Sequence, residues 1–124
     1  MSKTVLIVED DEIARTGLYT ILLSHGYDAL TAANGAEALQ RLRAGPPPDL
    51  ILLDMVLPTF DGWRFLPVWR QDPALASIPL VVMTGLAIAS DDWAKALGAA
   101  SLLRKPIDVN VLLGTVGRLT GTAA

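Results

Sequence analysis

Acidic side chains stand directly after two of the short apolar runs in this chain. Glu9 and Asp10 follow the first run, and Asp54 follows a later one. Two further apolar runs end at a hydroxyl, Thr84, and near an ammonium, Lys105. If the ends of these runs meet in space, three carboxylates, one hydroxyl and one ammonium surround a single small site.

That combination of groups suits phosphoryl chemistry. Carboxylates a few ångströms apart oppose one another's ionisation unless a cation compensates them. Mg²⁺ is such a cation, because it takes oxygen ligands and binds through one or two carboxylates together with water and phosphate. Asp54 is then a candidate nucleophile of the kind that forms an aspartyl phosphate. Lys105 would neutralise the transferred oxygens, and Thr84 would donate a hydrogen bond to one of them.

Each of these residues also has a plainer interpretation when it is taken alone. An acid after a strand often caps the following helix, and Asp11 or Glu12 fits that role. Asp54 could form a turn ahead of Pro58. Lys-Pro and Thr-Gly pairs are common in loops. A set of solvated charges has no reason to be spread over four strand ends, and this favours the functional interpretation.

Short apolar runs alternate with segments of helical periodicity along the whole chain. Runs without polar alternation are typical of parallel strands that are buried on both faces. The expected strands are Val5–Val8, Asp28–Ala32, Leu50–Leu53, Leu80–Met83 and Ala100–Leu103. Helices are expected around Ala14–Leu22, after Asn34, around Phe65–Trp69, from about Asp91 to Leu97 and around Val109–Val116. This alternation predicts an α/β fold, with a five-stranded parallel sheet covered by helices on both faces and a site at the carboxyl ends of the strands.

The composition excludes several other classes of protein. The chain has 124 residues and no cysteine, which rules out a disulfide scaffold and a thiol nucleophile. Its net charge is −3, from 10 basic and 13 acidic residues, so nothing favours binding to nucleic acid. The longest nearly apolar stretch falls short of the ~18 residues that suggest a membrane span. We expect one domain over residues 1–124, cytoplasmic, with no nucleic-acid or membrane partner.

The motifs at the strand ends resemble those of bacterial response-regulator receiver domains, the family of the chemotaxis response regulator. The matching pieces are Val-Leu-Ile-Val-Glu-Asp-Asp at 5–11, Asp-Met-Val-Leu-Pro-Thr-Phe-Asp-Gly at 54–62, Met-Thr-Gly at 83–85, Gly-Ala at 98–99 and Lys-Pro at 105–106. Each piece is modest alone, but together, in this order and at these spacings, they are highly specific. The resemblance covers essentially all of residues 3 to 120.

The resemblance implies a fold and a set of site residues. The fold is a flavodoxin-like (βα)5 three-layer sandwich with strand order 2-1-3-4-5. Asp54 is the implied phosphoacceptor, and Pro106 follows a cis peptide bond. Mg²⁺ would be bound directly by Asp10 and Asp54, and by Glu9 through a water. The implied site comprises Glu9, Asp10, Asp54, the backbone carbonyl of Val56, Thr84 and Lys105.

The function implied by the resemblance is that of a signalling switch in a two-component phosphorelay. A histidine kinase or a phosphotransfer protein would phosphorylate Asp54, and a downstream protein would bind the face made by the fourth helix, the fifth strand and the fifth helix. The domain would not be an enzyme and would show at most slow autodephosphorylation. Leu102 stands where the family usually has an aromatic residue, so coupling to that face is expected to differ.

Two alternatives use the same fold or chemistry. A haloacid-dehalogenase-like Mg²⁺-dependent phosphohydrolase would also use Asp54 as nucleophile, but it needs a second acid two residues later, where this chain has Val56. A flavodoxin-like flavin protein would need hydroxyls and glycines after the first strand. Glu9, Asp10 and Asp11 would repel a phosphate at that place.

Overall fold

Strands and helices alternate throughout the computed structural model, which describes residues 2–55 and 60–122. The strands are β1 (Thr4–Val8), β2 (Asp28–Ala32), β3 (Leu50–Asp54), β4 (Leu80–Thr84) and β5 (Ser101–Arg104). The helices are α1 (Glu12–Ser24), α2 (Gly35–Ala44), α3 (Phe60–Gln71), α4 (Pro73–Ala76), α5 (Asp91–Ala96) and α6 (Val109–Thr120). Among the described residues, no helix has both the length and the apolar character needed to span a membrane.

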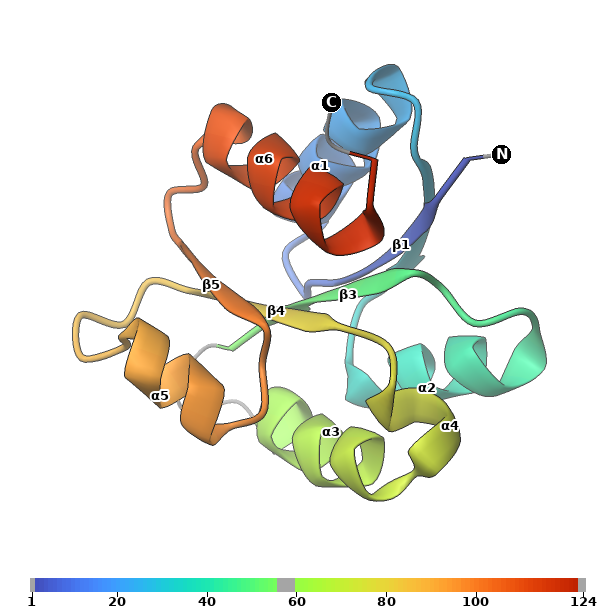
Figure 1. The fold of residues 1–124 in the computed structure, drawn as a ribbon, viewed down its shortest axis with the longest axis vertical. Coiled ribbons are helices and arrows are strands. Elements are labelled where there is room, and N and C mark those ends of the chain that lie inside the picture. The colour runs from blue at the N-terminus through green and yellow to red at the C-terminus, as the bar shows by residue number, and fades with distance from the viewer. Residues whose placement is uncertain (1, 56–59, 123–124) are drawn as a thin grey trace.

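The five strands form one parallel sheet in the order β2-β1-β3-β4-β5. Helices α1 and α6 cover one face, and α2 to α5 cover the other (Figure 1). The expected α/β three-layer fold and strand order are therefore confirmed. In such a sheet, ligands bind beyond the carboxyl ends of the strands where the strand order reverses, which here is between β1 and β3.

The strand register brings the candidate residues to one edge of the sheet. Val8 pairs with Leu53, so the residues that follow them, Glu9 and Asp54, leave the sheet at the same level. In the pair formed by β4 and β5, Thr84 lies opposite Arg104. Since parallel strands carry their side chains in register, the last residues of β1, β3, β4 and β5 form one row.

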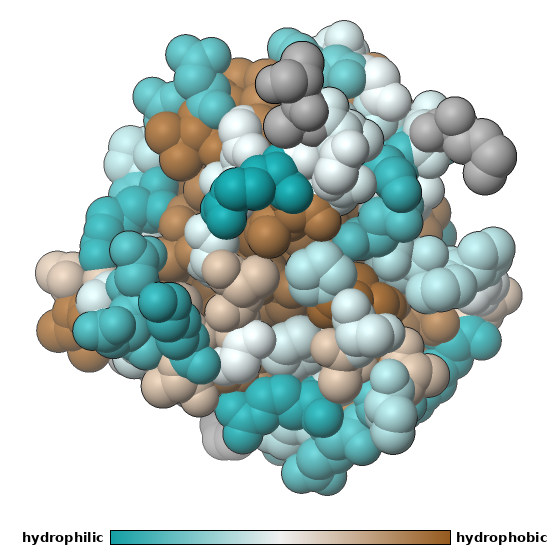
Figure 2. All heavy atoms as spheres, viewed as in Figure 1, coloured by the Kyte–Doolittle hydropathy of each residue, from teal (hydrophilic) through white to brown (hydrophobic). Residues whose placement is uncertain are grey.

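The core lies in two apolar layers, one on each side of the sheet. On β3, Ile51 and Leu53 pack into the layer under α2 to α5, while Leu50 and Leu52 pack into the layer under α1 and α6. Strand residues of this kind are completely buried, and each contributes roughly 1.5–3 kcal/mol through removal of its side chain from water. Hydrophilic residues cover most of the rim in Figure 2, and hydrophobic residues show in the band between the helical layers, where the edge strand β5 lies.

Side-chain caps fix where the helices begin. Asp11 accepts a hydrogen bond from the Ala14 amide at 2.8 Å and starts α1 immediately after the acidic pair. Asn34 does the same for α2, accepting from the Glu37 amide at 2.8 Å. Such caps are typically worth about 1 kcal/mol each. The capping interpretation is therefore confirmed for Asp11 and leaves Glu9 and Asp10 free for another role.

Some elements differ from the sequence-based expectation. The four-residue helix α4 was not expected, because Pro73 and three following residues are too short to show helical periodicity. Asp54 and Thr84 are the last residues of β3 and β4, so they stand at the strand ends as expected, and each strand is one residue longer than its apolar run. The Lys105–Pro106 peptide bond is cis, as the resemblance implied.

Two glycine substitutions should have opposite effects on stability. Gly98 has a φ of +91°, and a Cβ there would lie 3.1 Å from Arg70 Cδ, so Gly98→Ala should lower the free energy of unfolding by about 1–2 kcal/mol. Gly114 lies within α6 and has open space around it, so Gly114→Ala should raise it by roughly 0.5–1 kcal/mol. Urea unfolding measures both, and equal effects at the two positions would contradict the backbone argument.

Candidate functional site

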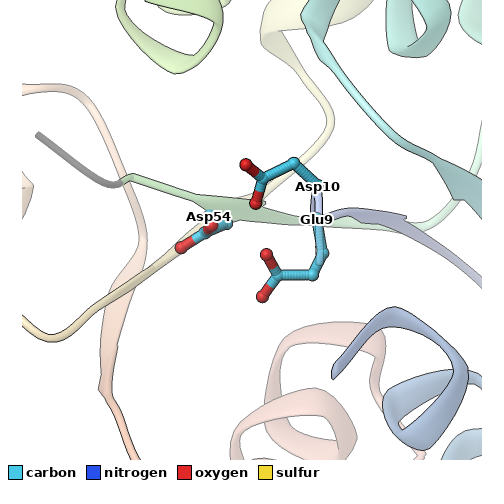
Figure 3. Close-up of side chains that lie close together, drawn as sticks. All are labelled: Glu9, Asp10 and Asp54. Carbon is cyan, nitrogen blue, oxygen red and sulfur yellow. The ribbon is translucent and has the colours of Figure 1, made fainter. Parts of the chain in front are cut away.

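Three carboxylates gather at the carboxyl ends of β1 and β3. Glu9 and Asp10 follow β1, Asp54 ends β3, and one oxygen of each lies within 4.8 Å of the others. The Asp10 and Glu9 side chains leave the end of β1 in opposite directions, and both carboxylates turn toward Asp54 (Figure 3). Glu9 is buried, with 1% of its surface exposed, whereas Asp10 is exposed to solvent. The cluster is therefore anchored inside the protein and open on one side.

Lys105 joins the two buried carboxylates. Its Nζ lies 2.8 Å from Glu9 Oε1 and 2.9 Å from Asp54 Oδ1. The lysine side chain is 30% exposed, while those of Glu9 and Asp54 are 1% and 6% exposed. One partly exposed cation thus compensates two carboxylates that are almost out of contact with water.

The Asp54 carboxylate keeps unused capacity to accept a ligand. Its Oδ1 is buried and accepts no aligned hydrogen bond from the described residues, although Lys105 Nζ is close enough to form an ion pair. A buried carboxylate oxygen without a hydrogen bond is costly. Together with the three converging oxygens, it makes the cluster a good fit for a hard divalent cation such as Mg²⁺.

Burial and neighbouring charges act on both members of the Lys105–Glu9 pair. Burial raises the pKa of the Glu9 carboxyl, and Asp54 raises it further, while Lys105 opposes the shift. For Lys105, burial alone would lower the pKa. Its hydrogen bond to Glu9 and its close interactions with the charges of Asp54 and Glu9 outweigh burial and raise the pKa of Lys105 above its ordinary value.

The hydroxyl of Thr84 lies in the same row of strand ends but has a different partner. Thr84 is completely buried, and its Oγ1 accepts a hydrogen bond from the Leu86 amide at 3.1 Å. The structure therefore brings Glu9, Asp54 and Lys105 into direct contact and places Thr84 beside them with its hydroxyl held by the following loop. Val56, expected to offer its backbone carbonyl to the metal, lies outside the described residues.

Two arginines near the site were not singled out from the sequence. Arg15 Nη1 donates to the carbonyls of Glu9, at 2.9 Å, and Asp10, at 3.3 Å. Its position in the first turns of α1 brings the Arg15 side chain back over the end of β1. In the sequence, the only indication of this contact is the spacing of Arg15 from the capping residue Asp11. Arg104 donates to two carbonyls of the loop after β4. Nothing in the sequence distinguishes it from other exposed arginines.

The fold and the site together define a class of protein. A doubly wound parallel sheet carries carboxylates and a lysine at its switch point, where this architecture places its ligands. The response regulator receiver domain model matches residues 5–117, and the chain belongs to that family. It is thus a receiver domain of two-component signalling, with an acidic cluster compatible with phosphorylation and Mg²⁺.

Individual relatives agree with this assignment. The polar-differentiation response regulator DivK of Brucella anthropi is 32% identical over 124 residues, covering 99% of this chain and 100% of the relative. The structure of chemotaxis response regulator CheY4 of Vibrio cholerae is 30% identical, with a TM-score of 0.83 over 96% of this chain and 99% of that one. A sensor histidine kinase receiver domain from Pseudomonas aeruginosa, with magnesium coordinated in its active-site cleft, is 26% identical, with a TM-score of 0.84 and coverage of 98% and 99%.

The raised pKa of Glu9 predicts a pH-dependent loss of stability in metal-free protein. The folded state holds a proton that the unfolded chain releases at its ordinary pKa of 4.5, so the free energy of unfolding should fall as pH rises from 4.5 through the folded pKa. Glu9→Gln cannot ionise and should show less of this fall. Urea unfolding with a chelator between pH 4.5 and 8 measures the slope, and Glu37→Gln on α2 should follow wild type. If the free energy of unfolding changes equally with pH in wild type and in Glu9→Gln, the pH dependence does not come from Glu9.

Proposed function

We propose that Asp54 is the phosphoacceptor of this receiver domain and that Mg²⁺ supports its phosphorylation. The observation that carries the proposal is the contact between Lys105 Nζ and Asp54 Oδ1 at 2.9 Å, at the open end of the sheet. A carboxylate held by a lysine, with one oxygen left without an aligned hydrogen bond, is suited to receive a phosphoryl group. Residues 1–124 would act as one such domain, in the cytoplasm.

The proposed reaction is transfer of a phosphoryl group to a carboxylate oxygen. An oxygen of Asp54 supplies the electron pair for the new O–P bond, while the bond from phosphorus to the donor breaks and its electrons leave with the donor. Lys105 would neutralise charge on the phosphoryl oxygens, and Thr84 would donate a hydrogen bond to one of them. Positioning and charge neutralisation are most of what such a transfer requires.

The residues for the metal follow from the acidic cluster. Asp10 and Asp54 would hold Mg²⁺ directly, Glu9 would act through a water, and the carbonyl of Val56 would complete the protein ligands. When bound, the ion supplies positive charge next to the oxygens of the incoming phosphoryl group. Asp10 is exposed and open to such an ion, whereas Glu9 is already paired with Lys105.

The proposed partners are a phosphodonor and a downstream protein. The donor would be a histidine kinase or a histidine-containing phosphotransfer protein. The downstream protein would bind the face made by α5, β5 and α6. Because the short helix α4 was not expected, α5 and α6 are the helices counted as fourth and fifth in the sequence. Large apolar side chains are exposed on and beside these helices, with Ile88 78% and Val111 55% exposed. Exposed aliphatic side chains of this kind suit a protein interface, because a partner gains by covering them.

Phosphorylation by a small donor tests the central proposal. Incubation with acetyl phosphate and Mg²⁺ should add the mass of one HPO3 group to the intact protein, and a chelator should prevent the addition. Asp54→Asn should stay unmodified, because an amide oxygen is too poor a nucleophile. Asp49→Asn, at a carboxylate that binds the Thr4 amide at the other end of the sheet, is the matched control and should be modified like wild type. An adduct that persists in Asp54→Asn would refute the proposal.

A metal titration tests the division of labour among the acids. Glu9→Gln should weaken Mg²⁺ binding about tenfold, as loss of an outer-shell ligand typically does, and Asp10→Asn should weaken it more. Asp11→Asn should bind like wild type, because Asp11 caps α1 and an asparagine caps equally well. Calorimetric titration measures the three affinities. The metal assignment fails if Asp10→Asn binds as tightly as wild type.

A further inference from the structure

Two arginine side chains hold the short helix α5 at opposite ends. Arg104, on β5, donates from Nη1 to the Leu86 carbonyl at 2.9 Å and from Nη2 to the Ala89 carbonyl. Arg70, near the end of α3, donates from Nη1 to the Leu97 carbonyl at 3.0 Å. Because α5 has only six residues, it has little stability of its own, and its position depends on such contacts.

Arg104 is also the direct neighbour of Thr84 in the sheet. The two residues are register partners on β4 and β5, and the Lys105 amide donates to the Thr84 carbonyl at 2.9 Å. Paired residues of parallel strands direct their side chains to the same face of the sheet. Arg104 therefore reaches over the loop that begins immediately after Thr84, in the part of Figure 1 where the chain passes from β4 to α5.

The peptide groups of Leu86 connect the arginine to the threonine. The Leu86 amide donates to Thr84 Oγ1 at 3.1 Å. The Leu86 carbonyl accepts from Arg104 and also from the Ala89 amide at 3.2 Å. Leu86 is thus held on both sides, and the Thr84 hydroxyl is linked to the guanidinium of Arg104 through one residue.

We propose that Arg104 is a positioning residue that holds Thr84 and the loop after β4 in the unphosphorylated arrangement. The inference rests on the proposed function, in which the Thr84 hydroxyl donates to a phosphoryl group on Asp54. Movement of that hydroxyl toward Asp54 either breaks its bond to the Leu86 amide or carries Leu86 with it. Arg104 opposes the second path, because it fixes the Leu86 and Ala89 carbonyls, and the path that remains costs the hydrogen bond between the Leu86 amide and the Thr84 hydroxyl. The contact therefore favours the resting state and lowers affinity for the phosphoryl group.

The position of Leu102 explains why this restraint falls to Arg104. Leu102 lies two residues earlier on β5, on the same face as Arg104, and packs against the apolar core beneath α5. It has no polar group with which to hold the loop. On the same face of β5, Arg104 has N–H donors that reach the carbonyls of the loop after β4.

Variants at the two arginines separate this role from simple charge. Arg104→Lys keeps the positive charge but loses the planar fork that reaches two carbonyls. Arg104→Met loses both the positive charge and the hydrogen-bond donors. Arg70→Lys is the matched control, since it removes a guanidinium–carbonyl bond from the far end of α5. Beryllofluoride with Mg²⁺ serves as the probe, because it mimics a phosphoryl group on a carboxylate, and calorimetry measures its affinity.

Arg104→Lys should bind beryllofluoride about fivefold more tightly than wild type, as release of a weak restraint allows. Arg104→Met should gain less affinity for beryllofluoride than Arg104→Lys does, because the methionine also removes a positive charge that favours an anionic ligand. Arg70→Lys should match wild type. Hydrogen exchange without ligand should show faster exchange of the Leu86 amide in both Arg104 variants and no change there in Arg70→Lys.

The possible outcomes distinguish this inference from the proposed function. If wild type binds beryllofluoride and Arg104→Lys binds it equally or more weakly, the restraint proposed for Arg104 is wrong. Unchanged exchange of the Leu86 amide in Arg104→Lys also overturns it. If wild type itself fails to bind the probe, the proposed function is wrong, and the role of Arg104 in that function falls with it.

Discussion

The ammonium of Lys105 is the charge on which the rest of the site depends. It lies within 3 Å of two carboxylates that are almost completely removed from water, those of Glu9 and Asp54. Without that cation, two buried negative charges would face each other, which is among the most destabilising arrangements in a protein interior. The fold must therefore place the end of β5 so that the Lys105 side chain reaches past β4 to the ends of β3 and β1. The compensation is incomplete, because one cation faces two carboxylates, and this leaves room for a divalent cation.

The sheet supplies the precision that this arrangement needs. Its central strands are buried on both faces, so a shift in register would misplace entire layers of core side chains as well as the site. The positions of Glu9, Asp54 and Thr84 are consequently set by packing several residues away. The loop after β4 is less constrained by the core, and there side-chain bonds from Arg104 and Thr84 replace packing as the source of order.

Much of the fold could be predicted because its signals are local. Unbroken apolar runs marked the strands, and Asp11 and Asn34 marked helix starts by their capping chemistry. The short helix α4 left no periodic signal. For the site, residue types at strand ends were sufficient to group the acids with Lys105. The links made by Arg15 and Arg104 were not predictable, because a guanidinium on a long, flexible stem can reach many carbonyls and tertiary geometry selects which.

The contact between Lys105 and Glu9 also bears on how the protein is made. It spans 96 positions of the chain, so the acids of β1 and β3 leave the ribosome well before the lysine that compensates them. A growing chain that has already paired these two strands holds its carboxylates together without their cation until β5 is added at the edge. Contacts between such distant residues form late and slowly. The contact of Lys105 with Glu9 and Asp54 therefore marks a chain in which all five strands have been made and have joined the sheet.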